Sequence, residues 1–271
     1  MSSVLFFFGI LWYTLGTLVI CGLAVTLFRK LFVTMMGGGV GRGIVLATSI
    51  VGTPVHELGH ALMCLLFGHK ITGMSLWQPA SSDGTLGYVT HTYRRRNIYH
   101  ILGNLFIGVG PVFSGLAVLM LALLLGFPAT FTEYTTTATY MASEGEGGLR
   151  LFWEGLKMLA QMWREAVHSS DVPVWVKIIT VFVILSVSQH ISLSPADIRG
   201  SLSALPLYAG LALLVTIVCS LLGQNAMESV TSALAKFSAY MTAFFVIVLV
   251  MALLQLLIAI PVWIIRKAVR R

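Results

Sequence analysis

The sequence predicts an all-α polytopic membrane protein with about six transmembrane helices. Only 10% of the 271 residues are charged and 57% are hydrophobic, whereas a soluble domain is typically about 25% charged. The hydrophobic residues also gather in runs that are long enough to cross a bilayer. This composition excludes a disordered chain, which needs high charge and low hydrophobicity. It also argues against a soluble enzyme, which could not cover its surface with so few charges.

The apolar runs give the order of the expected spans. They cover residues 4–28, 43–67, 99–127, 172–193, 204–222 and 239–265. The glycine-rich stretch 37–43 lacks the Gly-Lys-Ser/Thr ending of a phosphate loop, so it is interpreted as a flexible connector. The chain then divides into a first helix with its connector (1–42), a three-span core (43–202) and two C-terminal helices with a basic tail (203–271).

Two segments between the spans have a different pattern. Residues 71–93 carry β-branched and aromatic residues around the turn signal Ser81-Ser82-Asp83-Gly84, which predicts a small β-hairpin between the second and third spans. Residues 149–168 have apolar side chains at three- and four-residue spacing with charged residues between them, which predicts an amphipathic helix. That helix would lie in the membrane interface or cover one end of the bundle, and the pattern fits both.

The net charge of +7 raises the question of a nucleic-acid partner. The basic residues, however, cluster beside apolar spans, as in Arg29-Lys30, Arg94-Arg95-Arg96 and Arg266-Lys267. Such clusters are typical of residues that orient spans at a membrane surface. We therefore expect the lipid bilayer as a partner and no nucleic acid.

One motif with chemical meaning lies inside the second span, His56-Glu57-Leu58-Gly59-His60. Positions i and i+4 share a helix face, so His56 and His60 can present two imidazoles to one Zn²⁺. Glu57 lies next to that face, where it can take a proton from a metal-bound water. The alternative is a pair of histidines that snorkel or bridge helices beside a paired Glu, which is costly inside a membrane without an ion.

A catalytic zinc usually takes three protein ligands, so a third must be found. Met63 and Leu66 stand where an extended zincin motif would have Gly and His. Because the third and fourth spans cross out and back, Asp197 emerges on the side where the second span ends. Asp83 lies on the same side but in a predicted turn, where Asp has a local role. Asp197 is the preferred ligand, with a helix N-cap or a partner for Arg199 as the alternatives.

His190 lies two helical turns before Asp197 and could face the same site. A supporting hydrogen bond or a packed position in the membrane is expected for it, rather than direct ligation. His69, His91 and His100 lie on the same side of the membrane but belong to no motif.

Together these residues resemble the site-2 protease family of intramembrane zinc metalloproteases, in a compact form without a PDZ domain. The resemblance rests on the His-Glu-Leu-Gly-His run, on Asp197 beside a later span and on Gly110-Pro111 in the third span, and it covers about residues 43–202. It implies that His56, His60 and Asp197 hold zinc and that Glu57 is the general base. Asn104 stands earlier in the third span than the family's Asn and is a further supporting candidate.

The resemblance implies an intramembrane zinc metalloendopeptidase that cleaves membrane-anchored protein substrates within or near the bilayer. The hairpin edge could pair with an unwound substrate strand. Two alternatives stay open: a zinc-dependent membrane hydrolase of a small or lipid-like amide, and a non-proteolytic metal-binding scaffold or transporter. A transporter would be expected to show repeated halves, and an inactive scaffold need not keep Glu57.

In related proteases the loop after the zinc helix faces the cytosol. With that orientation, slightly more Lys and Arg residues lie inside than outside, as the positive-inside rule requires. The expectation is a multi-pass protein of the cell membrane with both termini in the cytoplasm. The oligomeric state is left open.

Overall fold

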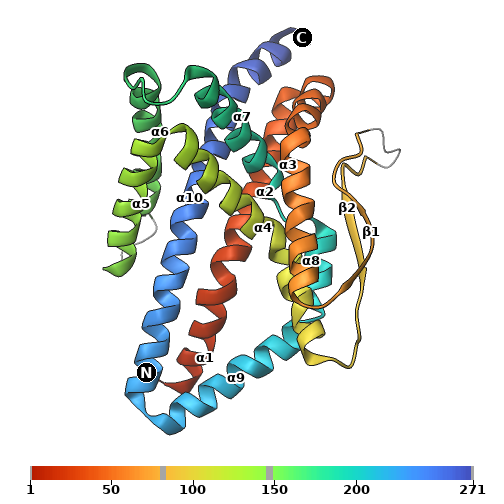
Figure 1. The fold of residues 1–271 in the computed structure, drawn as a ribbon, viewed down its shortest axis with the longest axis vertical. Coiled ribbons are helices and arrows are strands. Elements are labelled where there is room, and N and C mark those ends of the chain that lie inside the picture. Colours follow the sequence, from red (N-terminus) through yellow and green to blue (C-terminus); the bar gives the residue numbers. More distant parts are fainter. Residues whose placement is uncertain (1, 80–83, 145–148, 270–271) are drawn as a thin grey trace.

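The computed structural model describes residues 2–79, 84–144 and 149–269. These residues form a helical bundle with one two-stranded hairpin at its side (Figure 1). The helices are α1 (Ser3–Leu11), α2 (Thr17–Met36), α3 (Gly38–Leu66), α4 (Ile98–Gly126), α5 (Pro128–Ser143), α6 (Leu149–His168), α7 (Val174–His190), α8 (Pro195–Leu202), α9 (Leu205–Leu222) and α10 (Gln224–Val269). A π-helical segment, Trp12–Gly16, joins α1 to α2.

The prediction of a flexible connector over residues 37–43 is wrong. α2 continues to Met36, and α3 begins at Gly38 and includes the remaining glycines of the stretch. Only Gly37 breaks the helix, with a φ of 82°. The helix resumes at once, because Gly41 N–H donates to Gly37 O at 2.7 Å. In an apolar environment every backbone polar group needs an internal partner, which favours helix even in a glycine-rich segment.

The six predicted spans are not all found among the described residues. Four helices are long and apolar enough to cross a membrane, Ser3–Met36, Ile98–Gly126, Leu205–Leu222 and Gln224–Ala268, or five if α7 and α8 form one bent span. This is the architecture of a membrane protein. The helix that carries the histidine motif is not among them. Although α3 has 29 residues, its glycines, hydroxyl side chains, histidines and Glu57 lower its hydropathy.

The last helix is longer than the single predicted span. α10 has 46 residues, or about 69 Å at 1.5 Å per residue, against about 30 Å for the hydrocarbon core of a bilayer. In Figure 1 it runs beside α2 along the long axis of the molecule, and the N- and C-terminal ends lie at opposite ends of that axis.

The predicted hairpin is present. β1 (Lys70–Ser75) pairs antiparallel with β2 (Tyr88–Thr92), with Lys70 opposite Thr92 and Ser75 opposite Tyr88. The register shifts between Ile71 and Gly73. The turn predicted at residues 81–84 falls outside the described residues, except for Gly84. The strands lie alongside α3 (Figure 1), which brings the hairpin over the histidine motif.

The amphipathic helix predicted at 149–168 is confirmed as α6. Its buried residues are Leu151, Gly155, Met158, Met162 and Glu165. This face packs on α5 and α10, as Gly155 against Val246 illustrates, so the helix covers the bundle. Leu149, Trp163 and Val167, which the periodicity placed on the apolar face, are exposed. The segment before it is also helical, as α5, and Glu165 accepts hydrogen bonds from the N-terminal amides of α5, including Thr130 N at 2.8 Å.

α7 and α8 are joined at an angle of 57°. The link between them follows His190 and returns the chain toward α3 and α4 (Figure 1). The main hydrophobic core lies between α2, α4, α7 and α10, with Val112, Leu119, Ile184 and Phe245 among its fully buried side chains. This core holds α4 and α7, the two helices that pack most extensively on α3, which carries the histidine motif.

Candidate metal centre

α3 brings His56 and His60 onto one face, as the spacing predicted. Pro54 lies inside this helix, two residues before His56, and it cannot donate a backbone hydrogen bond to the preceding turn. His60 is buried and His56 is partly buried. Both imidazoles therefore lie within the protein, where they face α4 and α8.

Asp197 meets these histidines from the first turn of α8. Its carboxylate Oδ2 accepts a hydrogen bond from Ser194 N at 2.7 Å, and Ser194 Oγ accepts one from Asp197 N at 3.1 Å. This is a capping box, the reciprocal arrangement that closes a helix start. Capping of α8 and ligation of a metal are therefore compatible roles for Asp197, because its Oδ2 accepts from Ser194 N while its Oδ1 lies 3.1 Å from His60 Nε2. Among the described residues no ion pair joins Asp197 to Arg199.

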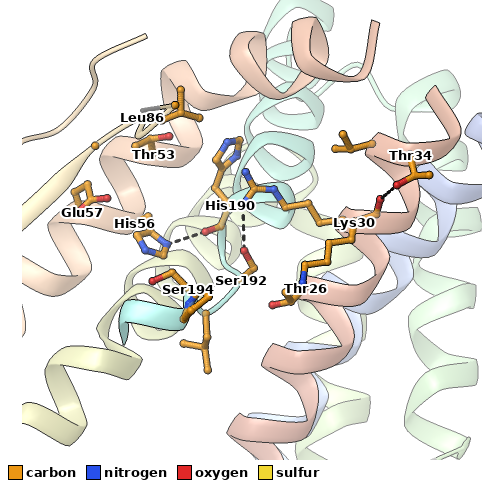
Figure 2. A pocket seen from close by; sticks show the side chains of 16 residues that line it. Thr26, Lys30, Thr34, Thr53, His56, Glu57, Leu86, His190, Ser192 and Ser194 are labelled. Atoms are coloured by element: carbon orange, nitrogen blue, oxygen red, sulfur yellow. Dashed lines mark hydrogen bonds between the residues drawn. The ribbon is translucent and has the colours of Figure 1, made fainter. Parts of the chain in front are cut away.

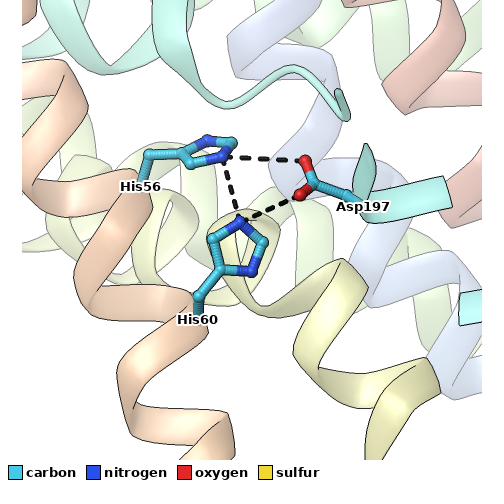
Figure 3. A group of neighbouring side chains, drawn as sticks. All are labelled: His56, His60 and Asp197. Atoms are coloured by element: carbon cyan, nitrogen blue, oxygen red, sulfur yellow. Dashed lines mark hydrogen bonds and ion pairs between the residues drawn. The ribbon is translucent and has the colours of Figure 1, made fainter. Parts of the chain in front are cut away.

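The three side chains converge on one point (Figure 3). His60 Nε2 lies 3.2 Å from His56 Nε2 and 3.1 Å from Asp197 Oδ1, and His56 Nε2 lies 3.7 Å from Asp197 Oδ2. Two ligands at about 2.0–2.1 Å from a tetrahedral zinc are separated by about 3.3–3.4 Å. The distances in the protein bracket that value. Over the described parts of the chain, this is the one group of three or more such side chains with metal-ligating geometry.

Backbone carbonyls fix the orientation of both rings. His56 Nδ1 lies 2.8 Å from His190 O, and His60 Nδ1 lies 2.7 Å from Ile107 O. A carbonyl oxygen only accepts, so each Nδ1 carries the hydrogen and each neutral ring turns the lone pair of Nε2 inward. Two lone pairs and a carboxylate then face one another at close range. A cation among them satisfies all three groups, so the donor set fits zinc.

A close crossing of α3 and α4 sets the position of the Ile107 carbonyl. A Cβ atom built on Gly59 would lie 2.6 Å from Gly110 O, and one built on Gly110 would lie 2.5 Å from Gly59 O. Only glycine allows the two backbones this approach. Ser114 Oγ adds a hydrogen bond across the crossing to Val55 O at 2.8 Å. Gly110, in the Gly110-Pro111 pair singled out from the sequence, is thus the point at which α4 packs closely against the histidine motif of α3.

Glu57 is 7% exposed and lies beside the histidines on α3. It lines two cavities that meet at the candidate metal centre. The first, of about 660 Å³, lies between α2, α3 and the link from α7 to α8 (Figure 2). The second, of about 680 Å³, lies between β2, α4 and α8. A carboxylate with access to both cavities can exchange protons with a molecule bound in either.

The supporting candidates are both close to the centre, in different ways. His190 contributes its backbone carbonyl to His56, while its own Nδ1 donates to Ser186 O at 2.9 Å. Its ring is not one of the convergent ligands. Asn104 is buried, donates to Ser203 Oγ at 3.0 Å and lines the second cavity. Asp83, the other acid considered as a ligand, lies outside the described residues.

Three further histidines form a separate cluster at the base of the hairpin. His69 Nδ1 lies 2.9 Å from His91 Nδ1, and His69 Nε2 donates to His100 O at 2.8 Å. The Tyr93 ring stacks on His69. Burial is the main reason that the pKa of His69 and the pKa of His91 lie below the ordinary histidine value. This cluster ties the hairpin to the ends of α3 and α4.

Sequence reasoning missed the backbone groups that orient the ligands, at Ile107 and His190, and the close contact of Gly87 with α3. A carbonyl group has no sequence signature. Comparison with known proteins adds nothing to the geometry: no family model matches the chain, and neither a curated protein nor a solved structure matches it.

Proposed function

We propose that this protein is an intramembrane zinc metalloendopeptidase that resembles the site-2 proteases and cleaves membrane-anchored protein substrates. The observation that carries the proposal is the convergence of His56 Nε2, His60 Nε2 and the Asp197 carboxylate, with both Nδ1 hydrogens held by backbone carbonyls. The neighbouring Glu57 supplies a general base, and the surrounding helices are those of a membrane protein.

Each residue of the centre has a separate task in this reaction. A zinc ion held by the two histidines and Asp197 would polarise the scissile carbonyl and lower the pKa of a water at the site. The carbonyls of His190 and Ile107 keep the rings of His56 and His60 in place. Glu57 would take one proton from the attacking water and deliver it to the nitrogen of the leaving amine.

The second cavity supports a peptide as the substrate. It is lined by Tyr88, Val89 and His91 of β2 as well as by the candidate centre. An unwound substrate strand could pair with this hairpin by β-augmentation, which supplies backbone hydrogen bonds to a chain that has lost its helix. The membrane location proposed for this reaction is the cell membrane, with the loop after α3 facing the cytosol.

The deciding experiment combines zinc analysis of the purified full chain with a co-expressed single-span reporter. We expect about one zinc per chain in wild type and in Glu57→Gln, and reporter cleavage in wild type only. Glu154→Gln is the matched control, because that acid pairs with Lys157 far from the centre, and it should cleave as wild type does. Cleavage by Glu57→Gln would overturn the mechanism. Bound zinc without cleavage of any reporter by wild type would favour the scaffold alternative.

A further inference from the structure

The first cavity contains an unpaired positive charge that the proposed chemistry does not use. Arg29 lies in α2, within the candidate span Ser3–Met36, and lines this cavity together with Lys30. It donates one hydrogen bond, from Nη1 to Ser192 Oγ at 3.2 Å. No ion pair among the described residues includes it. A guanidinium has five N–H donors, and an arginine within a span normally has a partner.

Two residues in the wall of the same cavity also have a buried polar atom without a partner. His190 is 5% exposed and Thr53 is 4% exposed, and both line the cavity. Neither His190 Nε2 nor Thr53 Oγ1 has a hydrogen-bond partner in the described protein. Buried polar atoms are almost always hydrogen-bonded, so the wall formed by these two residues has unused hydrogen-bonding capacity next to the cavity that Arg29 lines.

The cavity continues directly into the candidate centre. His56 and Glu57 form part of its wall, and His56 Nδ1 is bonded to the carbonyl of His190. Figure 2 shows His56, His190 and Ser192 on one side of the cavity and Lys30 and Thr34 of α2 on the other. Thr26, Ser192 and Ser194 add hydroxyl groups to the lining. An anion held between these walls would therefore lie in the same cavity as the proposed general base.

We propose that this cavity is a subsite for a substrate carboxylate, held by Arg29 with Lys30, so that the enzyme prefers a substrate with an acidic group near the bond that is cut. That the bound molecule is a substrate rests on the proposed function, whereas the binding of a carboxylate does not. A carboxylate suits the guanidinium because the two can form parallel, charge-assisted hydrogen bonds. The group could be an Asp or Glu side chain or the carboxylate at a peptide C-terminus.

Binding of defined probe peptides tests the subsite separately from catalysis. The probes are fluorescent Ala/Leu peptides of about 20 residues, a span length, with one Glu moved along the sequence and a Gln twin for each placement. A second pair has a free or an amidated C-terminus. Affinities are measured on the full chain carrying Glu57→Gln, so that no probe is cut. We expect one Glu placement, or the free C-terminus, to bind about tenfold more tightly than its neutral twin, which is the scale of one charge-assisted hydrogen bond.

The variants decide whether Arg29 is responsible. In the same background, Arg29→Gln should abolish the preference, Arg29→Lys should keep part of it, and Arg29→Glu should favour a Lys probe instead. Arg42→Gln, at an exposed cation outside the cavity, is the matched control and should keep the full preference. An acidic preference that survives Arg29→Gln, or equal binding of all charged and neutral twins, would overturn the proposal. Cleavage is measured in parallel on the chain that keeps Glu57. This distinguishes a failure of the proposed function from a failure of the subsite.

Discussion

Gly87 lies directly against Glu57. A Cβ atom built on Gly87 would stand 2.8 Å from Glu57 Cγ and 2.7 Å from Thr53 Cγ2. Real Cβ atoms do not approach other carbons this closely, so the hairpin reaches α3 only because residue 87 is glycine. Through this contact the backbone that precedes β2 packs against the proposed general base. Gly87 and Glu57 both line the two cavities.

The first prediction concerns this contact. Gly87→Ala should push the hairpin or the Glu57 side chain away and lower the cleavage rate at least tenfold, while zinc content stays at the wild-type level. Overpacking of this kind typically costs about 1–3 kcal/mol. Gly84→Ala is a poor control because Gly84 has a φ of 76°. Gly210→Ala is suitable, because Gly210 has open space around it on α9 and lines neither cavity. Wild-type cleavage by Gly87→Ala would show that the contact has no role.

The second prediction separates the two roles of the Asp197 carboxylate. Asp197→Ala removes a ligand and should weaken zinc binding by more than 100-fold, beyond the roughly 10–100-fold typical of groups that only orient ligands. Ser194→Ala removes the cap, at about 1 kcal/mol of stability, and should weaken zinc binding within that smaller range. Competition with a chelator measures both affinities. If Asp197→Ala keeps wild-type zinc affinity, the third ligand is another residue.

The third prediction concerns the crossing of α3 and α4. Gly110→Val should separate the helices, because its side chain would overlap the backbone of Gly59. The hydrogen bond from His60 Nδ1 to Ile107 O would then lengthen, and zinc affinity should fall about tenfold or more. Gly210→Val, at a position with nothing nearby on α9, is the control. Equal zinc affinity in the two variants would mean that the crossing does not position His60.

The fourth prediction is a pH dependence of the hairpin. The pKa of His69 and the pKa of His91 lie below the ordinary value of 6.5, mainly because of burial. The unfolded hairpin therefore binds more protons than the folded one, and the stabilisation present above about pH 6.5 is lost as the pH falls below that value. Once both rings are protonated, two N–H groups would face each other across the 2.9 Å contact between the Nδ1 atoms.

Hydrogen exchange of the β1 and β2 amides measures this effect. Protection should decrease between about pH 6.5 and pH 5, after correction for the intrinsic rate, and His91→Asn should reduce the dependence. The amides of α6, away from the cluster, serve as an internal reference. A constant corrected protection across this range would contradict the prediction.

The sequence by itself determined the local features. Helical spacing brought His56 and His60 to one face, and β-branched residues with a turn signal identified the hairpin. Both follow from interactions between residues close in the chain. The order of the predicted spans also singled out Asp197, which the structure brings to the histidines. Its ligation of zinc, and the reaction itself, stay predictions.

Only the tertiary structure decided what surrounds the centre. The carbonyls of Ile107 and His190 orient the histidines, and Arg29 meets Ser192 across the first cavity. These contacts join residues far apart in the chain, and the two carbonyls are backbone groups that every residue carries. No local pattern encodes them, because they exist only once the helices have packed.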